Sequence, residues 1–365
     1  MYAKLLLLTV CQIYNEGDLD MKKTLLFGLM VMMICGTLAF SALAMTSCSS
    51  SGQTRTSPGT IEAGGSVFDM EKRTVKLNNG IEMPVLGLGT YRLTTEQTEN
   101  SVYHALTDGY RLIETANGYM NERAVGRGIQ RSSVPREEIF VVTKLWPTDY
   151  EDTERAINET LARLGLNYID LLLLHQPYGN YVEGYKGMEA AVRQGKVRSI
   201  GLSNFFEERF SEIMNVATIP PAVLQIESNP FVHQTEMREF MKPYGTVLMA
   251  WFPLGGRIYD RSPSTSTQTL LFNNELIVEI AAAHNKTAAQ IILRWHLQAE
   301  NIAIPGSRNP AHILENISIF DFELTSEDMQ RLSTLDRGQG SFNFRNLGGD
   351  DPAWLSRPVD FNAQE

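Results

Sequence analysis

Glu114 and Tyr119 lie within one stretch, Gly109–Glu122, in which a short apolar segment passes into polar sequence. Glu114 directly follows the apolar residues Tyr110–Ile113, and Tyr119 lies on the loop expected after them. A phenol is a poor acid near neutral pH because its unperturbed pKa is about 10. A nearby cation lowers that pKa, and a carboxylate can hold the cation in place. The stretch fits either a proton-transfer site or an ordinary strand end with a surface tyrosine.

Two more groups of this kind stand at the ends of apolar runs. Lys144 closes the run Ile139–Thr143, and a lysine at the end of a buried strand must find a counter-ion or lose its proton. Glu114 is the expected partner, although a structural salt bridge would account for that pair without Tyr119. His175 directly follows a run of leucines. A lone histidine there is more often a core residue, but with three such groups expected nearby we interpret it as part of a site.

The segments that carry these groups belong to a regular alternation of short apolar runs and amphipathic stretches. Continuous apolar strands separated by helices predict a parallel sheet that is buried on both faces. Closed on itself, such a sheet is a (β/α)8 TIM barrel, a normal fold for about 250 residues or more. A doubly wound open sheet is the alternative, but Gly87–Tyr91 lacks the third glycine of a G-x-G-x-x-G fingerprint. The strand candidates are Val85–Leu88, Tyr110–Ile113, Ile139–Val142, Tyr168–Leu174, Val197–Gly201, Ala222–Ile226, Thr246–Ala250 and Ile302–Ile304.

Two local patterns give finer expectations. The turn Asn78-Asn79-Gly80 between Thr74–Leu77 and Ile81–Met83 predicts an N-terminal β-hairpin that closes the bottom of the barrel. Thr148–Gly165 predicts a helix, with a capping box from Thr148 to Glu151 and Gly165 as its left-handed stop.

The residues just past each strand of a barrel lie at its catalytic rim. A purely structural core would not need so many polar or aromatic residues at these positions. With one histidine and no carboxylate cluster among them, a metal-dependent hydrolase is a weak reading, and we expect no metal. The rim positions are Gly89-Thr90-Tyr91, Glu114, Lys144, His175, Ser203-Asn204, Gln225, Trp251-Phe252 and Pro305-Gly306-Ser307.

Composition excludes several other classes of function. The chain has 365 residues and a formal net charge of -10, which argues against a nucleic-acid partner. Its three cysteines, Cys11, Cys35 and Cys48, all precede the globular part. The globular part therefore has no internal disulfide, thiolate metal site or cysteine nucleophile.

The N-terminal region has the pattern of an export signal. Residues 1–20 are interpreted as an upstream extension, because Met21 is followed by Lys22-Lys23, an uncharged run and small residues. Residues 21–48 then form a signal peptide of lipoprotein type, with Cys48 as the lipidated residue. An uncleaved membrane anchor is the alternative, since the run is long enough to span a bilayer. Residues 49–65 form a tether, and residues 66–365 the barrel domain with a C-terminal loop. We expect a monomer in the periplasm or cell envelope.

From about Thr74 to Asn316 the chain resembles the aldo-keto reductase family. Any one of the matching segments alone would be a weak signal, but together and in order at predicted strand ends they are highly specific. They are GLGTY (87–91), GYRLIETANGYMNE (109–122), VVTKLW (141–146), LLLLHQP (171–177), GLSNF (201–205), LQIE (224–227), AWFPLG (250–255) and IPGSRNPAHILEN (304–316).

The resemblance implies hydride transfer from NADPH to an aldehyde or ketone carbonyl. It implies Tyr119 as proton donor, Lys144 as the cation that lowers its pKa, His175 as the residue that orients the carbonyl, and Glu114 as the carboxylate beside the lysine. Tyr91, Trp146, His175 and Phe252, with part of the tail around Phe342–Trp354, would line the substrate pocket. The cofactor would contact Gly89, Thr90, Tyr91, Glu114, Ser203, Asn204, Gln225, Trp251, Phe252, Leu254, Gly306, Ser307, Arg308, His312, Glu315 and Asn316.

Three departures from the family pattern matter. Glu114 replaces the family's aspartate, which moves the carboxylate outward by one methylene. Gly306 and His312 replace a lysine and an arginine expected at the adenosine 2′-phosphate; Arg308 could compensate, and NADH is the alternative cofactor. An export signal is unusual for the family. An exported barrel that binds cofactor or ligand with little or no turnover is therefore the alternative to a carbonyl reductase.

Overall fold

The computed structural model describes residues 67–256, 266–338 and 359–365. The expectations for residues 1–65, including Cys48, and for Phe342–Trp354 lie outside these ranges.

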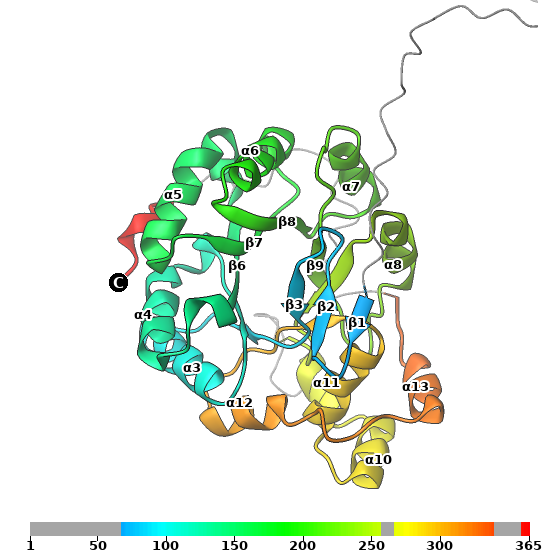
Figure 1. Cartoon of the computed structure of the whole chain (residues 1–365). Coiled ribbons are helices and arrows are strands. Elements are labelled where there is room, and N and C mark those ends of the chain that lie inside the picture. Colours follow the sequence, from blue (N-terminus) through cyan, green and yellow to red (C-terminus); the bar gives the residue numbers. More distant parts are fainter. Residues whose placement is uncertain (1–66, 257–265, 339–358) are drawn as a thin grey trace, which may run out of the picture. The chain divides into compact units, whose positions relative to one another are not determined.

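An eight-stranded parallel sheet forms the centre of the fold (Figure 1). Its strands follow one another in sequence order, and the residues of the central strands are buried on both faces, as their continuous apolar character predicts. The strands are β4 (Leu88–Gly89), β5 (Leu112–Glu114), β6 (Phe140–Leu145), β7 (Ile169–Leu174), β8 (Val197–Ser203), β9 (Val223–Glu227), β10 (Val247–Trp251) and β11 (Ile302–Ala303).

The first and last strands meet and close the sheet. The Gly87 amide donates to the Ala303 carbonyl at 2.9 Å, and the Ala303 amide donates to the Val85 carbonyl at 3.0 Å. Leu86 also bridges Ala303 in parallel register. The (β/α)8 barrel predicted from the sequence is confirmed, and the open-sheet alternative is wrong.

Helices surround the sheet and cover its outer face (Figure 1). Buried aromatic side chains such as Tyr185, Phe205 and Phe210 fill part of the layer between helices and strands. The helices are α3 (Thr95–Thr107), α4 (Glu122–Ser132), α5 (Thr153–Leu164), α6 (Tyr181–Arg193), α7 (Glu207–Met214), α8 (Thr235–Met241), α9 (Thr267–Phe272), α10 (Glu275–His284), α11 (Ala288–Gln298), α12 (Pro310–Ile317) and α13 (Ser326–Ser333).

The predicted capping box at Thr148 is wrong. Residues Pro147–Asp152 form a short 3-10 helix, η3, and α5 begins after it. Asp152 is the N-cap, because its side chain accepts a hydrogen bond from the Arg155 amide. A proline at the first position favours the tighter turn, which delays the start of the α-helix. Gly165 ends α5 with φ 66°, as predicted.

A three-stranded antiparallel sheet lies at one end of the barrel: β1 (Val67–Asp69), β2 (Thr74–Lys76) and β3 (Glu82–Pro84). The Asn78 side chain in its turn donates to the carbonyls of Pro221 and Tyr244 at 3.0 and 3.1 Å. These two residues precede β9 and β10, so the hairpin covers the end at which the strands begin. Figure 1 looks onto this end, and the site must lie at the opposite one. β1 was not predicted from the sequence.

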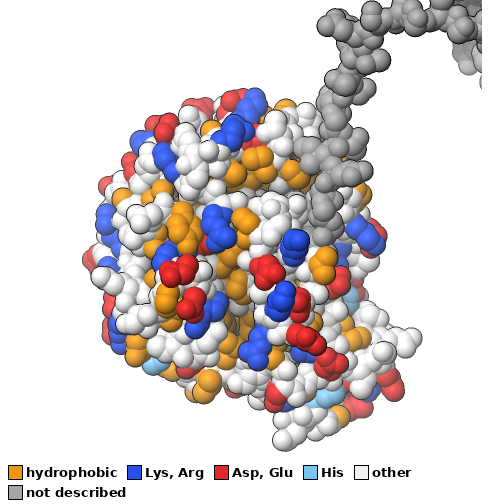
Figure 2. All heavy atoms as spheres, viewed as in Figure 1, with side chains coloured by type: hydrophobic (Ala, Val, Ile, Leu, Met, Phe, Trp, Pro, Cys, Tyr) orange, Lys and Arg blue, Asp and Glu red, His pale blue; other side chains and the backbone are white. Residues whose placement is uncertain are grey.

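The face shown in Figure 2 carries acidic and basic side chains that are interspersed rather than gathered by sign. Within the three described ranges, no helix combines the length and the apolar character needed to cross a bilayer.

Candidate active site

Lys144 lies at the centre of the polar groups at the carboxyl ends of β5 and β6. Its ammonium donates to Glu114 Oε1, to the Thr115 carbonyl at 3.1 Å and to the Tyr119 hydroxyl at 2.8 Å. An ammonium has three N–H donors, and here it has three acceptors. The geometry therefore fits the charged form of Lys144, and the expected pairing with Glu114 is confirmed.

The backbone places these groups by two different means. Lys144 and Glu114 stand on neighbouring parallel strands, whereas Tyr119 ends η1 (Asn117–Tyr119) on the loop after β5. Asn121 holds this loop, because its side chain donates to the Thr90 carbonyl at 3.0 Å and accepts from Thr115 at 2.8 Å. Asn121 is itself buried, so the loop is held from within.

The electrostatics differ from the expectation that Lys144 lowers the pKa of Tyr119. Burial raises the pKa of Tyr119 well above 10, and the negative charge of Glu114 adds to that rise. Burial also lowers the pKa of Lys144, against the opposing effect of Glu114. Desolvation is the largest cause of both shifts. Tyr119 therefore carries its proton at neutral pH.

The oxygen of Tyr119 nevertheless lies within hydrogen-bond distance of a cation. It accepts a hydrogen bond from Lys144, while its own hydroxyl donates only a long bond of 3.4 Å to Glu114 Oε1. A long, weak bond is easily replaced by one to another acceptor. Once the proton leaves, the ammonium already lies against the developing phenolate, so Lys144 stabilises the charge that forms.

His175 completes the group of four. Its ring lies edge-on to Tyr119 at 5.6 Å and to Trp146 at 5.0 Å, measured between ring centroids. Burial lowers the pKa of His175 well below 6.5, and the charge of Lys144 adds to this. The imidazole is therefore neutral, with one nitrogen that donates and one that accepts.

Glu114, Tyr119 and His175 line a large cavity of about 1500 Å³. Sites for single small molecules usually measure about 300–1,000 Å³, so this one has room for a dinucleotide beside a substrate. Two predicted site residues do not line it. Lys144 lies behind Glu114 and Tyr119, and Thr90 is fully buried against the Glu114 backbone. The predicted residues that do line it are Gly89, Tyr91, Glu114, Tyr119, Trp146, His175, Ser203, Asn204, Gln225, Trp251, Phe252, Leu254, Gly306, Ser307, Arg308, His312, Glu315 and Asn316.

One part of the cavity wall, next to Glu114, carries amides and an indole. Gln225 donates to Glu114 Oε1 at 3.2 Å, which leaves its own carbonyl oxygen as an acceptor. The Trp251 indole donates to Asn204 Oδ1 at 3.0 Å, and the Asn204 amide in turn donates to the His175 carbonyl and to the Gln176 side chain. The indole and the amides are thus fixed before any ligand arrives.

Another part of the wall carries Arg308, His312 and the start of α12. Arg308 and His312 are exposed, and within the described residues no hydrogen bond or ion pair engages the Arg308 guanidinium. Asn309 caps α12, whose first residue is Pro310. An arginine beside a helix N-terminus suits an anion.

Several lining residues were missed in the sequence. Gln176 belongs to the quoted LLLLHQP segment, and its contact with Asn204 was not foreseen. Gln268, Thr269 and Phe272 of α9 also line the cavity, in a region where no strand end pointed to a site. Their only signal is the Ser- and Thr-rich composition before α9.

The comparisons with known proteins agree with this geometry. A morphine 6-dehydrogenase of Pseudomonas putida is 42% identical over 270 residues, covering 72% of this chain and 91% of that protein. A glyoxal reductase of Bacillus subtilis is 42% identical over 273 residues, covering 73% of this chain and 94% of that protein.

Solved structures show the same likeness. An aldo-keto reductase from a deep-sea metagenome library has a TM-score of 0.69 and 41% identity, over 73% of this chain and 96% of that one. An aldo-keto reductase of Bombyx mori in complex with NADP has a TM-score of 0.69 and 32% identity, over 73% of this chain and 94% of that one. The model of the Aldo/keto reductase family matches residues 85–337. The chain belongs to the aldo/keto reductase family.

Proposed function

We propose that the protein reduces an aldehyde or ketone carbonyl with NADPH, and that Tyr119 gives the proton. The observation that supports this best is the hydrogen bond of 2.8 Å from Lys144 to the Tyr119 hydroxyl at the wall of the large cavity. It leaves the phenol protonated and its oxygen supported by a cation.

The cofactor, when bound, supplies the hydride. The chain's own residues then act on the carbonyl oxygen. The Tyr119 hydroxyl exchanges its long bond to Glu114 for one to that oxygen, and passes its proton as negative charge develops there. Neutral His175 can donate a second hydrogen bond to the same oxygen, which is the role of an oxyanion hole. Lys144 stabilises the phenolate that remains.

The residues present fit a nicotinamide dinucleotide. The free acceptor of Gln225, with Ser203 and Asn204 beside it, suits a carboxamide, and Trp251 offers an aromatic face for stacking. Ser307, Arg308 and His312 at the start of α12 suit a phosphate. Tyr91, Trp146 and Phe252 give the remaining space an aromatic wall that suits apolar carbonyl substrates.

The test of this function is loss of NADPH absorbance by purified protein with a panel of aldehydes and ketones. Turnover that depends on the carbonyl is expected. Binding of NADPH without turnover on any member of the panel would favour the alternative, a barrel that binds cofactor and has lost its activity.

The preference for NADPH over NADH is expected to depend on Arg308. Arg308→Ala removes a charge-assisted contact to the 2′-phosphate and should weaken NADPH binding roughly 10- to 100-fold. NADH lacks that phosphate, so its Kd serves as the internal control and should not change. Fluorescence titration of both cofactors measures this. Equal weakening of both would show that Arg308 does not read the phosphate.

The N-terminal region is proposed to anchor the protein through lipid at Cys48. Labelled fatty acid supplied to growing cells should enter the wild-type protein and be absent from Cys48→Ala. An unlabelled wild type that still sediments with membranes would instead favour an uncleaved anchor.

A further inference from the structure

A buried ion pair lies behind the site, on the outer side of the strand that carries Lys144. Arg163 Nε on α5 donates to Glu122 Oε2 on α4 at 2.6 Å, and the two side chains are 1% and 0% exposed. The other carboxylate oxygen accepts from the Thr143 hydroxyl at 2.6 Å. Thr143 and Lys144 are neighbours on β6, so their side chains point to opposite faces of the sheet. The ion pair thus touches the residue next to Lys144.

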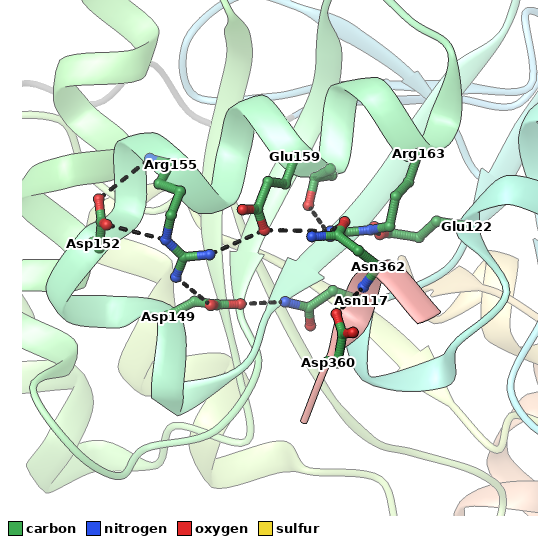
Figure 3. Close-up of polar contacts among 10 residues, drawn as sticks. Asn117, Glu122, Asp149, Asp152, Arg155, Glu159, Arg163, Asp360 and Asn362 are labelled. Carbon is green, nitrogen blue, oxygen red and sulfur yellow. Dashed lines mark hydrogen bonds and ion pairs between the residues drawn. The ribbon is translucent and has the colours of Figure 1, made fainter. Parts of the chain in front are cut away.

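The last residues of the chain complete this pair. Asn362 Oδ1 accepts from Arg163 Nη1 at 2.9 Å, and Figure 3 shows the tail with Asp360 and Asn362 lying against α5. Phe361 and Gln364 are buried there, and Gln364 Oε1 accepts from the Arg123 amide on α4 at 3.3 Å. The segment Asp360–Gln364 is therefore docked on both helices.

The same network also reaches the loop of Tyr119 (Figure 3). Asn117, in η1 with Tyr119, donates to Asp149 Oδ2 at 2.7 Å. The Arg155 guanidinium lies 3.2 Å from Asp149 Oδ1 and 3.0 Å from Glu159 Oε2. Glu159 Oε2 in turn lies 3.8 Å from Arg163 Nη1. Two routes thus connect the tail to the active groups, one through Thr143 and one through Asn117.

Charge also connects the pair with Lys144. Burial raises the pKa of Glu122, and the charge of Arg163, which the tail contacts through Asn362, opposes that rise. An ionised Glu122 favours the charged form of Lys144. The other titratable groups that face Lys144 are Glu114, Tyr119 and His175. Of all the groups that act on Lys144, Glu122 is the one whose ion-pair partner, Arg163, contacts the tail.

We propose that Asp360–Gln364, acting through Arg163 and Glu122, positions Lys144 and keeps it charged for the reaction. Glu122, Arg163 and Asn362 are positioning residues, because none of them lines the cavity. The kinetic part of this inference rests on the proposed reductase function.

The test compares three variants with the wild type. The first is a chain that ends at Pro358, the second is Glu122→Gln, and the third combines both changes. Each single change should lower kcat roughly 10-fold and move the basic limb of the kcat/KM profile down by about half a unit to one pH unit, with KM and the NADPH Kd unchanged. Because both changes act through the same charge, the double variant should add little to either one. Asn362→Leu is a milder variant and should move the basic limb in the same direction.

The matched control is Arg127→Gln. Arg127 contacts the Glu365 carbonyl at 3.4 Å and so touches the tail, but it does not touch the buried pair. Its pH profile should equal that of the wild type. A lower Tm in the shortened chain with an unchanged kcat and basic limb would overturn the proposal, since a merely structural role gives that result. Additive effects in the double variant would overturn it too.

A second readout does not depend on turnover. The side-chain carboxyl carbon of Glu122, labelled with 13C and assigned with Glu122→Gln, should titrate at a higher pH in Asn362→Leu than in the wild type, because this variant removes the contact to Arg163 and keeps the pair covered. An unchanged titration would overturn the coupling even in an active enzyme. A shift in a protein without turnover would support the coupling while the proposed function failed.

Discussion

Replacing Tyr119 with phenylalanine is expected to lower kcat by roughly 100- to 10,000-fold, the usual contribution of a positioned general acid. The hydroxyl is lost from the only phenol that Lys144 contacts among the described residues. The ring remains, and Ser203, Asn204 and Gln225, which we propose hold the nicotinamide, lie on or directly after other strands. The Kd for NADPH should therefore stay within about twofold of wild type if the hydroxyl acts only in the transition state.

Tyr91→Phe is the matched control for Tyr119→Phe. The Tyr91 ring lies in the same cavity, 4.9 Å from the Tyr119 ring, but Tyr91 is 45% exposed and Lys144 does not contact it. Steady-state kinetics with one aldehyde should separate the two variants. If Tyr119→Phe keeps near wild-type turnover, or if both variants lose activity equally, Tyr119 is not the proton donor.

Removing the charge of Glu114 is expected to have the next largest effect. Glu114→Gln leaves Lys144 without its counter-ion in a fully buried position, so desolvation lowers the pKa of Lys144 further. A neutral lysine supports the phenolate less well, and the rate should fall roughly 10- to 100-fold. The loss should be greatest at high pH, because Lys144 is then deprotonated first.

Glu114→Asp tests the extra methylene without changing the charge. Glu114 Oε1 already contacts Lys144, Tyr119 and Gln225, so its neighbours are arranged for the longer side chain. We therefore expect the aspartate variant to be slower than wild type and faster than Glu114→Gln. Glu315→Gln is the control, since Glu315 lines the same cavity and pairs with Thr287 instead. Equal rates for glutamate, aspartate and glutamine would remove Glu114 from the mechanism.

Most of the barrel could be predicted because its strands are short, apolar and end in polar residues. The predicted strand Tyr168–Leu174 differs from β7 by one residue. Lys144 lies on β6, directly after the apolar run that predicted this strand. The start of α5 could not be predicted in the same way, because the choice between Thr148 and Asp152 as the cap depends on how Pro147 turns the chain.

Two features of the site depend on tertiary structure and had no sequence signal. The contact between Arg163 and Asn362 joins residues from distant parts of the chain, and no local pattern relates them. The rise in the pKa of Tyr119 comes first from burial, and the negative charge of Glu114 adds to it. Residue types alone indicate which groups are charged, but they do not indicate how deeply Tyr119 is buried, and burial is the largest cause of its pKa shift.

The seam that joins Val85–Gly87 to Ala303 also governs when the barrel can form. Residues from nearly the whole length of the domain must be present before this contact is made. A chain that is still being synthesised cannot close the barrel until Ala303 has emerged from the ribosome. Such late, non-local contacts slow folding. The seam therefore makes closure of the barrel a late step of folding, which follows the pairing of strands that are neighbours in sequence.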